Sequence, residues 1–302
     1  MSPFTKGQKV SVSGMDFEVG ELFAQGEVCD LYSCTYSTKK VAKHETIYDA
    51  LLDDDDDRPA LIKVVRDRMD ADFVSREIKN LAALWPGGPE DAFLRFLPQV
   101  LASDEPRSLI VMPHYQGYVT LAQVSESFPG GLDFQDLAWM FKRLMSALGF
   151  AHSRGYVHGA VYPPHVLVHP TEHGARVLDW TYSVKIGQNI PAYAYDWDDF
   201  CAPEIRCKAN AGPSTDIYMA GKCAIAILGG NVRTNAFPDK VPKEVRDFLL
   251  RCVDPAPADR PQDAWQLHED FDAVLKKLVG KPKYRKLVLP RTGDPGDSPS
   301  GA

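Results

Sequence analysis

Three charged side chains stand in an order along the chain that could hold an anion and a metal ion. Lys63 lies in the apolar stretch LIKVV, Glu77 follows inside a helical pattern, and Asp179 stands in VLDWTYS. A lysine offers a compact positive charge to anionic groups, and carboxylate oxygens suit hard metal ions. Each residue alone is typical of a solvated face. The three residues become informative because they occur in a fixed order with several other short stretches of the chain.

The elements that must position these residues are strands in the first part of the chain. Residues 11–37 alternate apolar and polar side chains with glycines between them, which predicts an antiparallel meander. ALIKVV at 60–65 predicts a further strand, and SLIVMPHYQGYV predicts a strand that runs into a loop. Between these two strands, residues 70–84 carry apolar side chains at helical spacing, at positions Phe73, Val74, Ile78 and Leu81.

The later part of the chain is helical in pattern. One apolar stripe within residues 134–155 consists of Leu137, Phe141, Leu144, Met145 and Leu148. Gly155 stands where a helix C-cap belongs. The sequence therefore predicts an α+β fold of two lobes, a small sheet-rich N-lobe and a larger helical C-lobe, with the boundary between Tyr115 and Val119.

Composition excludes several function classes. The 302 residues are 44% hydrophobic and 25% charged, which is ordinary for a globular protein. The net charge of −7 gives no general attraction to nucleic acid or to an anionic membrane, so we expect neither as a partner. The six cysteines lack metal-binding spacing, which favours reduced core thiols. Without a bilayer-spanning apolar run or a signal peptide, the expected location is the cytoplasm.

The expected domain bounds follow from these shifts in pattern. Residues 1–17 form an N-terminal extension, 18–116 the N-lobe, and 117–279 the C-lobe. An acidic insertion at about 39–59 contains five consecutive aspartates, which we expect at a solvated hairpin tip because like charges repel. Residues 280–302 end in a Pro-, Gly- and Ser-rich run, so we expect a disordered tail.

Three stretches complete the order begun by Lys63: APE at 202–204, DIYMAG at 216–221 and ADRP at 258–261. With them, the chain resembles the eukaryotic-type protein kinase fold over nearly its whole length. The resemblance is most specific in the C-lobe, where these three stretches lie. The bilobal α+β architecture expected from the patterns is also what this resemblance implies.

The same resemblance assigns structural roles to four C-lobe residues. It implies a buried ion pair between Glu204 and Arg260. We expect Asp216 to N-cap the helix that follows it and to tie down the backbone of the loop at 158–168. His158 has no acidic neighbour in sequence, so we expect a core histidine packed under that loop.

The resemblance also implies a nucleotide site. Lys63 and Glu77 match the pair that positions phosphates, and Asp179 matches the metal-binding aspartate, although Trp180 and Thr181 replace the phenylalanine and glycine after it. Gly26 is the one glycine kept in the glycine-rich loop. The implied cofactor is ATP with Mg²⁺ or Mn²⁺, bound weakly. Two structural alternatives stay open: Lys63–Glu77 as a bridge that fixes the helix, and Asp179 as a turn residue.

The catalytic loop has lost the chemistry that the resemblance would assign to it. The family pattern HRDLKPxN appears here as HGAVYPPH. Ala160 stands at the position of the catalytic aspartate, and a methyl group can neither orient nor accept a proton. His165 stands at the position of the asparagine that holds the second metal ion, and imidazole is a poor ligand for magnesium. Tyr162 and Gly159 replace the loop's lysine and arginine.

The base pocket is altered as well. Leu61 occupies the place of the small alanine that packs on adenine in the family. Its additional carbons would fill part of the space for the base, and Ala24 and Cys29 replace two glycines of the phosphate-binding loop. We therefore expect weak or no ATP binding.

These features predict a pseudokinase that acts as a regulator or scaffold through a protein partner. The alternatives are an active ATP-dependent phosphotransferase with a non-standard catalytic loop, and a purely structural interaction module. Three acids near the substrate side could in principle replace the missing base, namely Asp196, Asp198 and Asp199. The aromatic residues beside them favour a binding surface instead: Tyr193, Tyr195 and Trp197.

Overall fold

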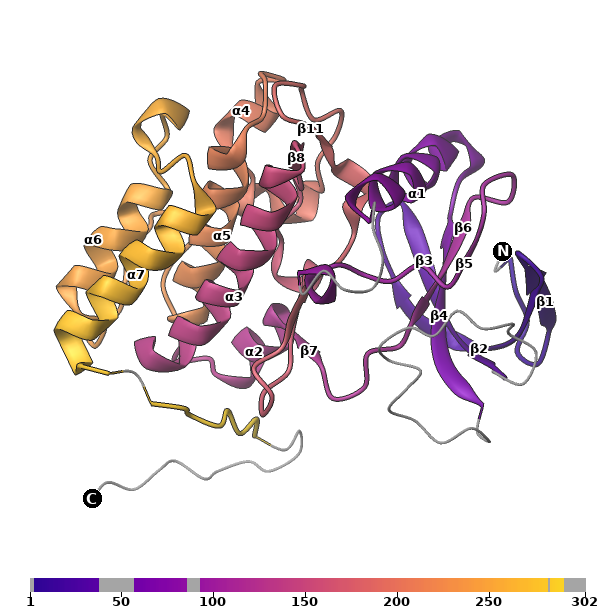
Figure 1. The fold of residues 1–302 in the computed structure, drawn as a ribbon, viewed down its shortest axis with the longest axis horizontal. Helices are drawn as coiled ribbons and strands as arrows, with labels where there is room; N and C mark the ends of the chain where they lie inside the picture. The colour runs from indigo at the N-terminus through magenta and orange to yellow at the C-terminus, as the bar shows by residue number, and fades with distance from the viewer. Residues whose placement is uncertain (1–2, 38–56, 86–92, 282, 291–302) are drawn as a thin grey trace.

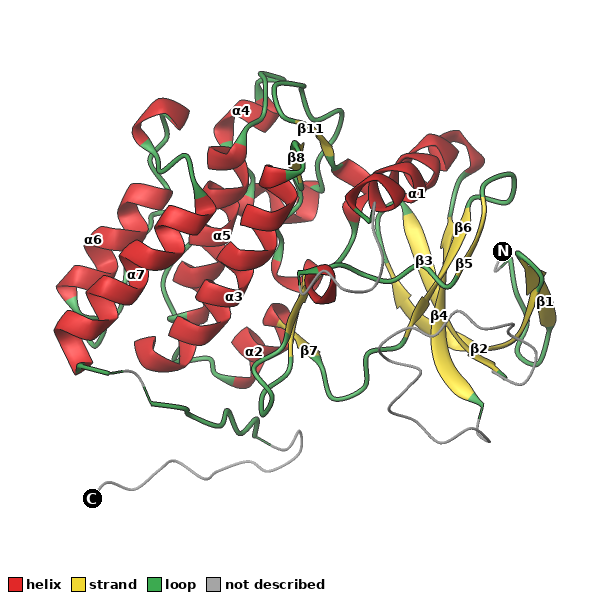
Figure 2. Ribbon diagram, viewed as in Figure 1, coloured by secondary structure: helices red, strands yellow, loops and turns green. Residues whose placement is uncertain are grey.

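The computed structural model describes residues 3–37, 57–85, 93–281 and 283–290. The six-stranded sheet and α1 form one lobe, and the other helices with several short strands form the second; a short segment between Pro113 and Val119 joins them (Figure 1). Figure 2 shows this segregation by colour, with the yellow sheet and α1 on one side and the red helices on the other. The predicted α+β bilobal fold is confirmed.

The N-lobe is built on a six-stranded antiparallel sheet with the order β1-β2-β3-β4-β6-β5. Its strands are β1 Lys9–Val12, β2 Met15–Gln25, β3 Cys29–Tyr36, β4 Arg58–Val65, β5 Ala102–Asp104 and β6 Leu109–Pro113. The sheet begins before residue 18, where the sequence placed the start of the N-lobe. Val10 and Phe17 are buried against Ile62 in one cluster, so residues 9–17 belong to the sheet rather than to an extension.

Strand alternation decides which side chains face the cleft between the lobes. One apolar cluster of the N-lobe joins side chains of β1 and β2 to three side chains of β4, namely Ala60, Ile62 and Val64. Successive side chains of a strand point to opposite faces, so Leu61 and Lys63 point the other way. On that face lies α1, Ala71–Leu84, preceded by the 3₁₀ turn η3, Arg68–Asp70.

The C-lobe packs short strands and 3₁₀ turns around a set of helices. The helices are α2 Leu121–Ser127, α3 Phe134–Ser153, α4 Pro203–Arg206, α5 Pro213–Ile227, α6 Lys243–Cys252 and α7 Ala264–Val279. The strands are β7 Val119–Thr120, β8 Tyr156–Val157, β9 Val166–Val168, β10 Ala175–Val177 and β11 Val184–Lys185. The 3₁₀ turns are η4 Leu94–Phe96, η5 Pro163–His165, η6 Trp180–Tyr182, η7 Tyr195–Phe200 and η8 Pro257–Asp259.

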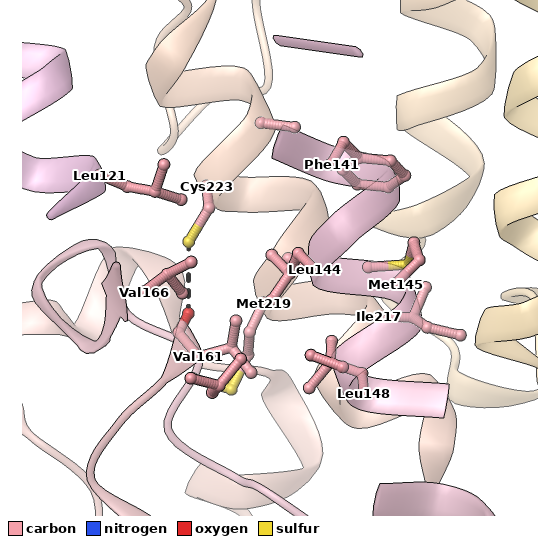
Figure 3. Packing of buried hydrophobic residues seen from close by; sticks show 14 of the residues in the cluster. Leu121, Phe141, Leu144, Met145, Leu148, Val161, Val166, Ile217, Met219 and Cys223 are labelled. Atoms are coloured by element: carbon pink, nitrogen blue, oxygen red, sulfur yellow. Dashed lines mark hydrogen bonds between the residues drawn. The ribbon is translucent and has the colours of Figure 1, made fainter. Parts of the chain in front are cut away.

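The core of the C-lobe lies directly beneath the loop at 158–168. The predicted stripe of α3 is buried throughout, and α5 presents Ile217, Met219 and Cys223 to it (Figure 3). The thiol of Cys223 contacts the carbonyl oxygen of Val161 at 3.3 Å. The loop is therefore anchored from below by packed helices.

The expected disorder of residues 280–302 is corrected for the part that the structure describes. Leu287 is 5% exposed against the C-lobe core, Arg285 pairs with Asp136 at 2.8 Å, and Tyr284 stacks on His173. The sequence contains these anchoring side chains before its Pro- and Gly-rich end. Residues 291–302 lie outside the described residues.

Two other expectations concern the acidic insertion and helices that could cross a membrane. Most of the acidic insertion, including Asp53 to Asp56, lies outside it, and β4 already begins at Arg58. Among the described residues, none of the helices combines the length and the apolar character that crossing a bilayer requires.

Candidate active site

The ammonium group of Lys63 is the centre of a largely buried group of charged and polar side chains between the sheet, α1 and residues 179–181. It donates to Glu77 Oε2 at 2.6 Å, to Asp179 Oδ1 at 2.7 Å and to Thr181 Oγ1 at 2.9 Å. Burial alone lowers the pKa of Lys63, but Asp179 and Glu77 outweigh it and raise the pKa above its ordinary value. A lysine has three N–H donors, and here all three are directed at side chains of this protein.

Helix α1 is fastened to the segment after Asp179. Glu77 Oε1 accepts a hydrogen bond from the backbone N–H of Trp180 at 3.1 Å, and its Oε2 accepts one from the Thr181 hydroxyl at 3.1 Å. One turn further, Asn80 Nδ2 donates to the carbonyl oxygen of Ser183 at 2.8 Å. The helix thus holds its glutamate in the cleft through contacts with the C-lobe as well as with Lys63.

Asp179 is held on both of its carboxylate oxygens. Its backbone is in the left-handed region, with φ of 62°, at the start of η6. Oδ1 accepts from Lys63, and Oδ2 lies 3.2 Å from Nε2 of His165. Burial raises the pKa of Asp179, but the neighbouring Lys63 and His165 hold it well below its usual range. The carboxylate is ionised and already neutralised by protein groups.

His165, which the sequence resemblance aligns with a metal-binding asparagine, is held on both of its ring nitrogens. Its Nδ1 lies 2.9 Å from the carbonyl oxygen of Ala160, and its ring meets Tyr162 edge-on at 5.5 Å. The contact with Asp179 on the other ring nitrogen completes three attachments. The structure therefore brings together two of the residues that sequence analysis singled out, His165 and Asp179, as partners of each other.

The catalytic loop is closed to solvent. Ala160, Val161 and Tyr162 are each 0% exposed. The ring of Tyr162 stacks on Trp197 of η7 with centroids 6.2 Å apart. The segment at 195–200 thus packs on the loop through this aromatic pair.

Asp216 and His158 support the loop from inside. The carboxylate of Asp216 accepts hydrogen bonds from the backbone N–H groups of His158 and Gly159, both at 2.8 Å, and contacts His152 at 2.9 Å. Asp216 does not N-cap α5, because that helix begins at Gly212 and Pro213, a turn earlier. The expected backbone role is seen and the expected cap is not.

His158 is fully buried, and its two hydrogen bonds are those of a neutral imidazole. Its Nδ1 accepts from the N–H of Ala160 at 3.2 Å, and its Nε2 donates to the carbonyl oxygen of Leu178 at 2.8 Å. The ring lies edge-on to Trp180, which is itself 0% exposed. Burial lowers the pKa of His158 to about 4. The residue packs and positions backbone, with no free nitrogen for acid–base chemistry.

The glycine-rich loop is tight and leans on the C-lobe. The N–H of Gly26 donates to the carbonyl oxygen of Cys29 at 2.8 Å, and a Cβ at Gly26 would come within 2.8 Å of that oxygen. Only glycine fits this turn. Glu27 beside it accepts a long hydrogen bond, 3.4 Å, from the N–H of Asp196 in η7. The loop tip therefore meets the segment that covers the catalytic loop.

The acids proposed as a substitute base are not aimed at the loop. Asp198 pairs with Arg206 at 3.0 Å, Asp199 pairs with Arg233 at 3.1 Å, and the side chain of Asp196 is exposed. Within the described ranges, the structure holds no cluster of three or more His, Cys, Asp or Glu residues able to bind a metal ion.

A buried ion pair anchors the C-lobe. Arg260 Nη1 donates to Glu204 Oε1 at 2.7 Å and its Nη2 donates to Oε2 at 3.0 Å. Three backbone carbonyls, of Asp254, Ser214 and Pro255, accept the other contacts of the guanidinium group. Both side chains are nearly inaccessible, at 0% and 4%. This is the pair that the resemblance implied.

Thr181 is the site residue whose role sequence reasoning missed. It was noted as a replacement for glycine, yet its hydroxyl accepts from Lys63 and donates to Glu77, so it sits between the two. The signal was available in part: a hydroxyl-bearing residue stands two positions after a conspicuous aspartate. Its direction depends on the left-handed backbone at Asp179, which the sequence does not specify.

Comparisons with known proteins agree on one architecture. No family model matches the chain. It is 23% identical over 194 residues to the calcium/calmodulin-dependent protein kinase type 1 of Caenorhabditis elegans, covering 52% of this chain and 56% of that protein. It is 24% identical over 246 residues to the serine/threonine-protein kinase PknK of Mycobacterium bovis, covering 73% of this chain and 22% of that protein. The chain thus spans about half and about a fifth of these two relatives.

A solved structure gives the same result for the fold. The kinase domain of Mycobacterium tuberculosis PknI superposes with a TM-score of 0.61 at 17% identity. The alignment covers 90% of this chain and 99% of that one. At this identity the similarity concerns the arrangement of the elements, and the chemistry has to be argued from the residues in the cleft.

Proposed function

Because this chain is a protein-kinase-like domain with the fold of the eukaryotic-type protein kinases, we propose that it is a pseudokinase, a regulator or scaffold that binds ATP weakly or not at all. The observation that carries the proposal is the closed catalytic loop. Ala160 has no proton-accepting group and is fully buried, and Tyr162 of the same loop stacks on Trp197. General-base assistance contributes typically about 10²–10⁴-fold to rate, and none of the three nearby acids is placed to restore it.

The cofactor site argues in the same direction. A nucleotide needs donors for its phosphates, but the three N–H groups of Lys63 are already engaged. Magnesium needs oxygen ligands, but both oxygens of Asp179 face protein cations or ring nitrogens. Leu61 of β4 is half-buried, pairs with Met112 of β6, and is larger than the alanine that the resemblance places there against the base. These residues fit ATP with a divalent cation poorly.

A protein partner is the remaining part of the proposal. Two apolar side chains next to the covered catalytic loop stay open to solvent, Ile186 at 43% and Tyr195 at 78% exposure. Tyrosine combines a large apolar ring with a hydroxyl, and it is enriched where proteins dock. Of the three aromatic residues predicted to form a binding surface, Trp197 instead packs inward on Tyr162.

Labelled-phosphate transfer tests the proposal. Purified protein is incubated with γ-labelled ATP, Mg²⁺ or Mn²⁺, and generic protein substrates, in parallel with an Asp179→Ala variant. We expect background labelling that is the same for both proteins. Robust transfer that disappears in Asp179→Ala would show an active phosphotransferase and would overturn the proposal.

A further inference from the structure

We infer that the metal position of this cleft is filled by the protein's own side chains, so that the cleft binds neither Mg²⁺ nor Mn²⁺. His165 takes the place of the ion, and Lys63, Glu77 and Thr181 complete a set of mutually satisfied groups. The inference deepens the proposed function and rests on it, since it concerns the same cleft. It adds which single residue keeps the ion out.

The carboxylate that would bind the ion, that of Asp179, is engaged by protein groups on both oxygens. A divalent cation would need an open lone pair of the Asp179 carboxylate and surroundings without competing positive charge. Oδ1 is bound by the ammonium of Lys63 at 2.7 Å, and Oδ2 is met by Nε2 of His165 at 3.2 Å. A metal ion at this carboxylate would meet the positive charge of Lys63, which Glu77 on α1 holds in place, and the ring of His165.

An ion bound at Asp179 would also need oxygen ligands from neighbouring residues. Mg²⁺ requires an octahedron of oxygen ligands and Mn²⁺ also favours oxygen. Position 165 offers ring nitrogens in place of an amide oxygen, and position 160 offers a methyl group. The hydroxyl of Thr181 accepts from Lys63 and donates to Glu77. The cleft thus lacks a second oxygen-bearing side chain at positions 160 and 165.

Neighbouring groups hold the ring of His165 in its position. The ring is held at Nδ1 by the carbonyl oxygen of Ala160 at 2.9 Å and lies edge-on to buried Tyr162. Its side chain is 18% exposed, so it is largely enclosed. Both ring nitrogens face oxygen atoms. Swinging the ring out would leave the carbonyl oxygen of Ala160 and Asp179 without these contacts, which costs free energy in a buried site.

The test is a direct titration of the full chain with Mn²⁺ alone, monitored by the electron paramagnetic resonance of the free ion, with thermal unfolding as a second measurement. Three proteins are compared: wild type, His165→Asn, which restores an amide oxygen, and His165→Leu, which removes the imidazole without supplying a ligand. We expect no saturable Mn²⁺ binding by wild type or His165→Leu. We expect saturable Mn²⁺ binding by His165→Asn alone, with an affinity about 10–100-fold above the weakest that the titration detects, the scale on which groups around a metal change its binding.

Two results would overturn the inference. One is saturable Mn²⁺ binding by wild type that is lost in Asp179→Asn, which needs no folded His165 variant. The other is a folded His165→Asn protein that binds no better than wild type, because His165 would then not be what excludes the ion. Neither result bears on phosphate transfer. A protein that binds Mn²⁺ but leaves substrates unlabelled refutes this inference and leaves the proposed function standing.

Discussion

Each lobe contributes to a cluster of charge removed from water, and the two clusters are completed in different ways. In the C-lobe, the guanidinium group of Arg260 binds Glu204 and three backbone carbonyls. In the cleft, the ammonium of Lys63 binds three side chains, those of Glu77, Asp179 and Thr181. Backbone acceptors come with the fold, whereas side-chain acceptors change with a single substitution.

This difference explains why the same kind of motif match has different value in the two places. The match at Glu204 and Arg260 implies a contact between two residues, and the fold supplies everything else. The match at Lys63 and Asp179 implies a ligand, and the ligand depends on further residues that here are Thr181 and His165. Retained charged residues therefore report a retained scaffold in both clusters, but they do not by themselves report a retained cofactor.

The largest effect that tests this comparison is expected in the C-lobe. Arg260→Ala leaves Glu204 buried without its partner, and breaking a buried pair in this way costs about 3–5 kcal/mol. We expect the free energy of unfolding to fall by that amount in urea denaturation followed by circular dichroism. An unchanged denaturation midpoint would contradict the structural role of this cluster.

A similar effect is expected from the histidine beneath the catalytic loop. The pKa of His158 is lowered by burial to about 4, from an ordinary value of 6.5. As pH falls from 6.5 towards 4, the unfolded chain takes up a proton that the folded chain refuses, so stability falls with pH. The loss should reach about 3 kcal/mol, complete near pH 4.

The His158→Gln variant isolates this effect from the carboxylates that titrate in the same range. The difference in unfolding free energy between wild type and variant is measured from pH 7 to pH 4. It should change steadily in favour of the variant as pH falls. A difference that does not vary with pH would mean that the pKa of His158 is the same in the folded and unfolded protein, so that burial does not lower it.

A smaller change in stability is expected in the cleft. Thr181→Val keeps the shape of the side chain but removes the acceptor for the third N–H of Lys63, and an unsatisfied buried donor costs about 1–3 kcal/mol. Thr181→Ser, which keeps the hydroxyl, serves as the matched control in thermal unfolding. If both variants melt alike, the hydroxyl does not hold Lys63, and the contrast between the two clusters weakens.

The smallest effect on stability is expected for an ion pair that is exposed rather than buried. Arg233 and Asp199 form an ion pair of the same chemistry as Arg260 and Glu204, but their side chains are 78% and 38% exposed. Exposed pairs contribute little to stability. We expect Arg233→Ala to melt at the temperature of wild type in the same assay. A clear loss would indicate that the surface around η7 is more constrained than its exposure suggests.

The fold was predictable because it depends on patterns that survive substitution. Alternation in β2 to β4 and the stripe of α3 give the two lobes, whichever apolar residue fills each position. Asp216 was misplaced as a helix cap although the sequence held the signal, since glycine followed by Pro213 marks the start of a helix. The anchored part of the C-terminal segment was likewise marked by Leu287 ahead of the Pro- and Gly-rich end.

The candidate site was predictable only where two residues act on each other. That Lys63 and Glu77 approach each other follows from the order of strand and helix. The contacts of Thr181 and His165 do not, because they depend on the left-handed backbone of Asp179 and on how the η5 turn directs an imidazole. A loop supplies such geometry through its torsion angles, and no periodic pattern in the sequence encodes them.

The fastening of α1 has a consequence for the motions of the molecule. Lys63, Glu77 and Asn80 join β4, α1 and residues 179–183 across the two lobes, largely through groups hidden from water. Regions joined in this way open as cooperative units. Native-state hydrogen exchange should therefore find the amides of β4, α1 and η6 sharing one opening event.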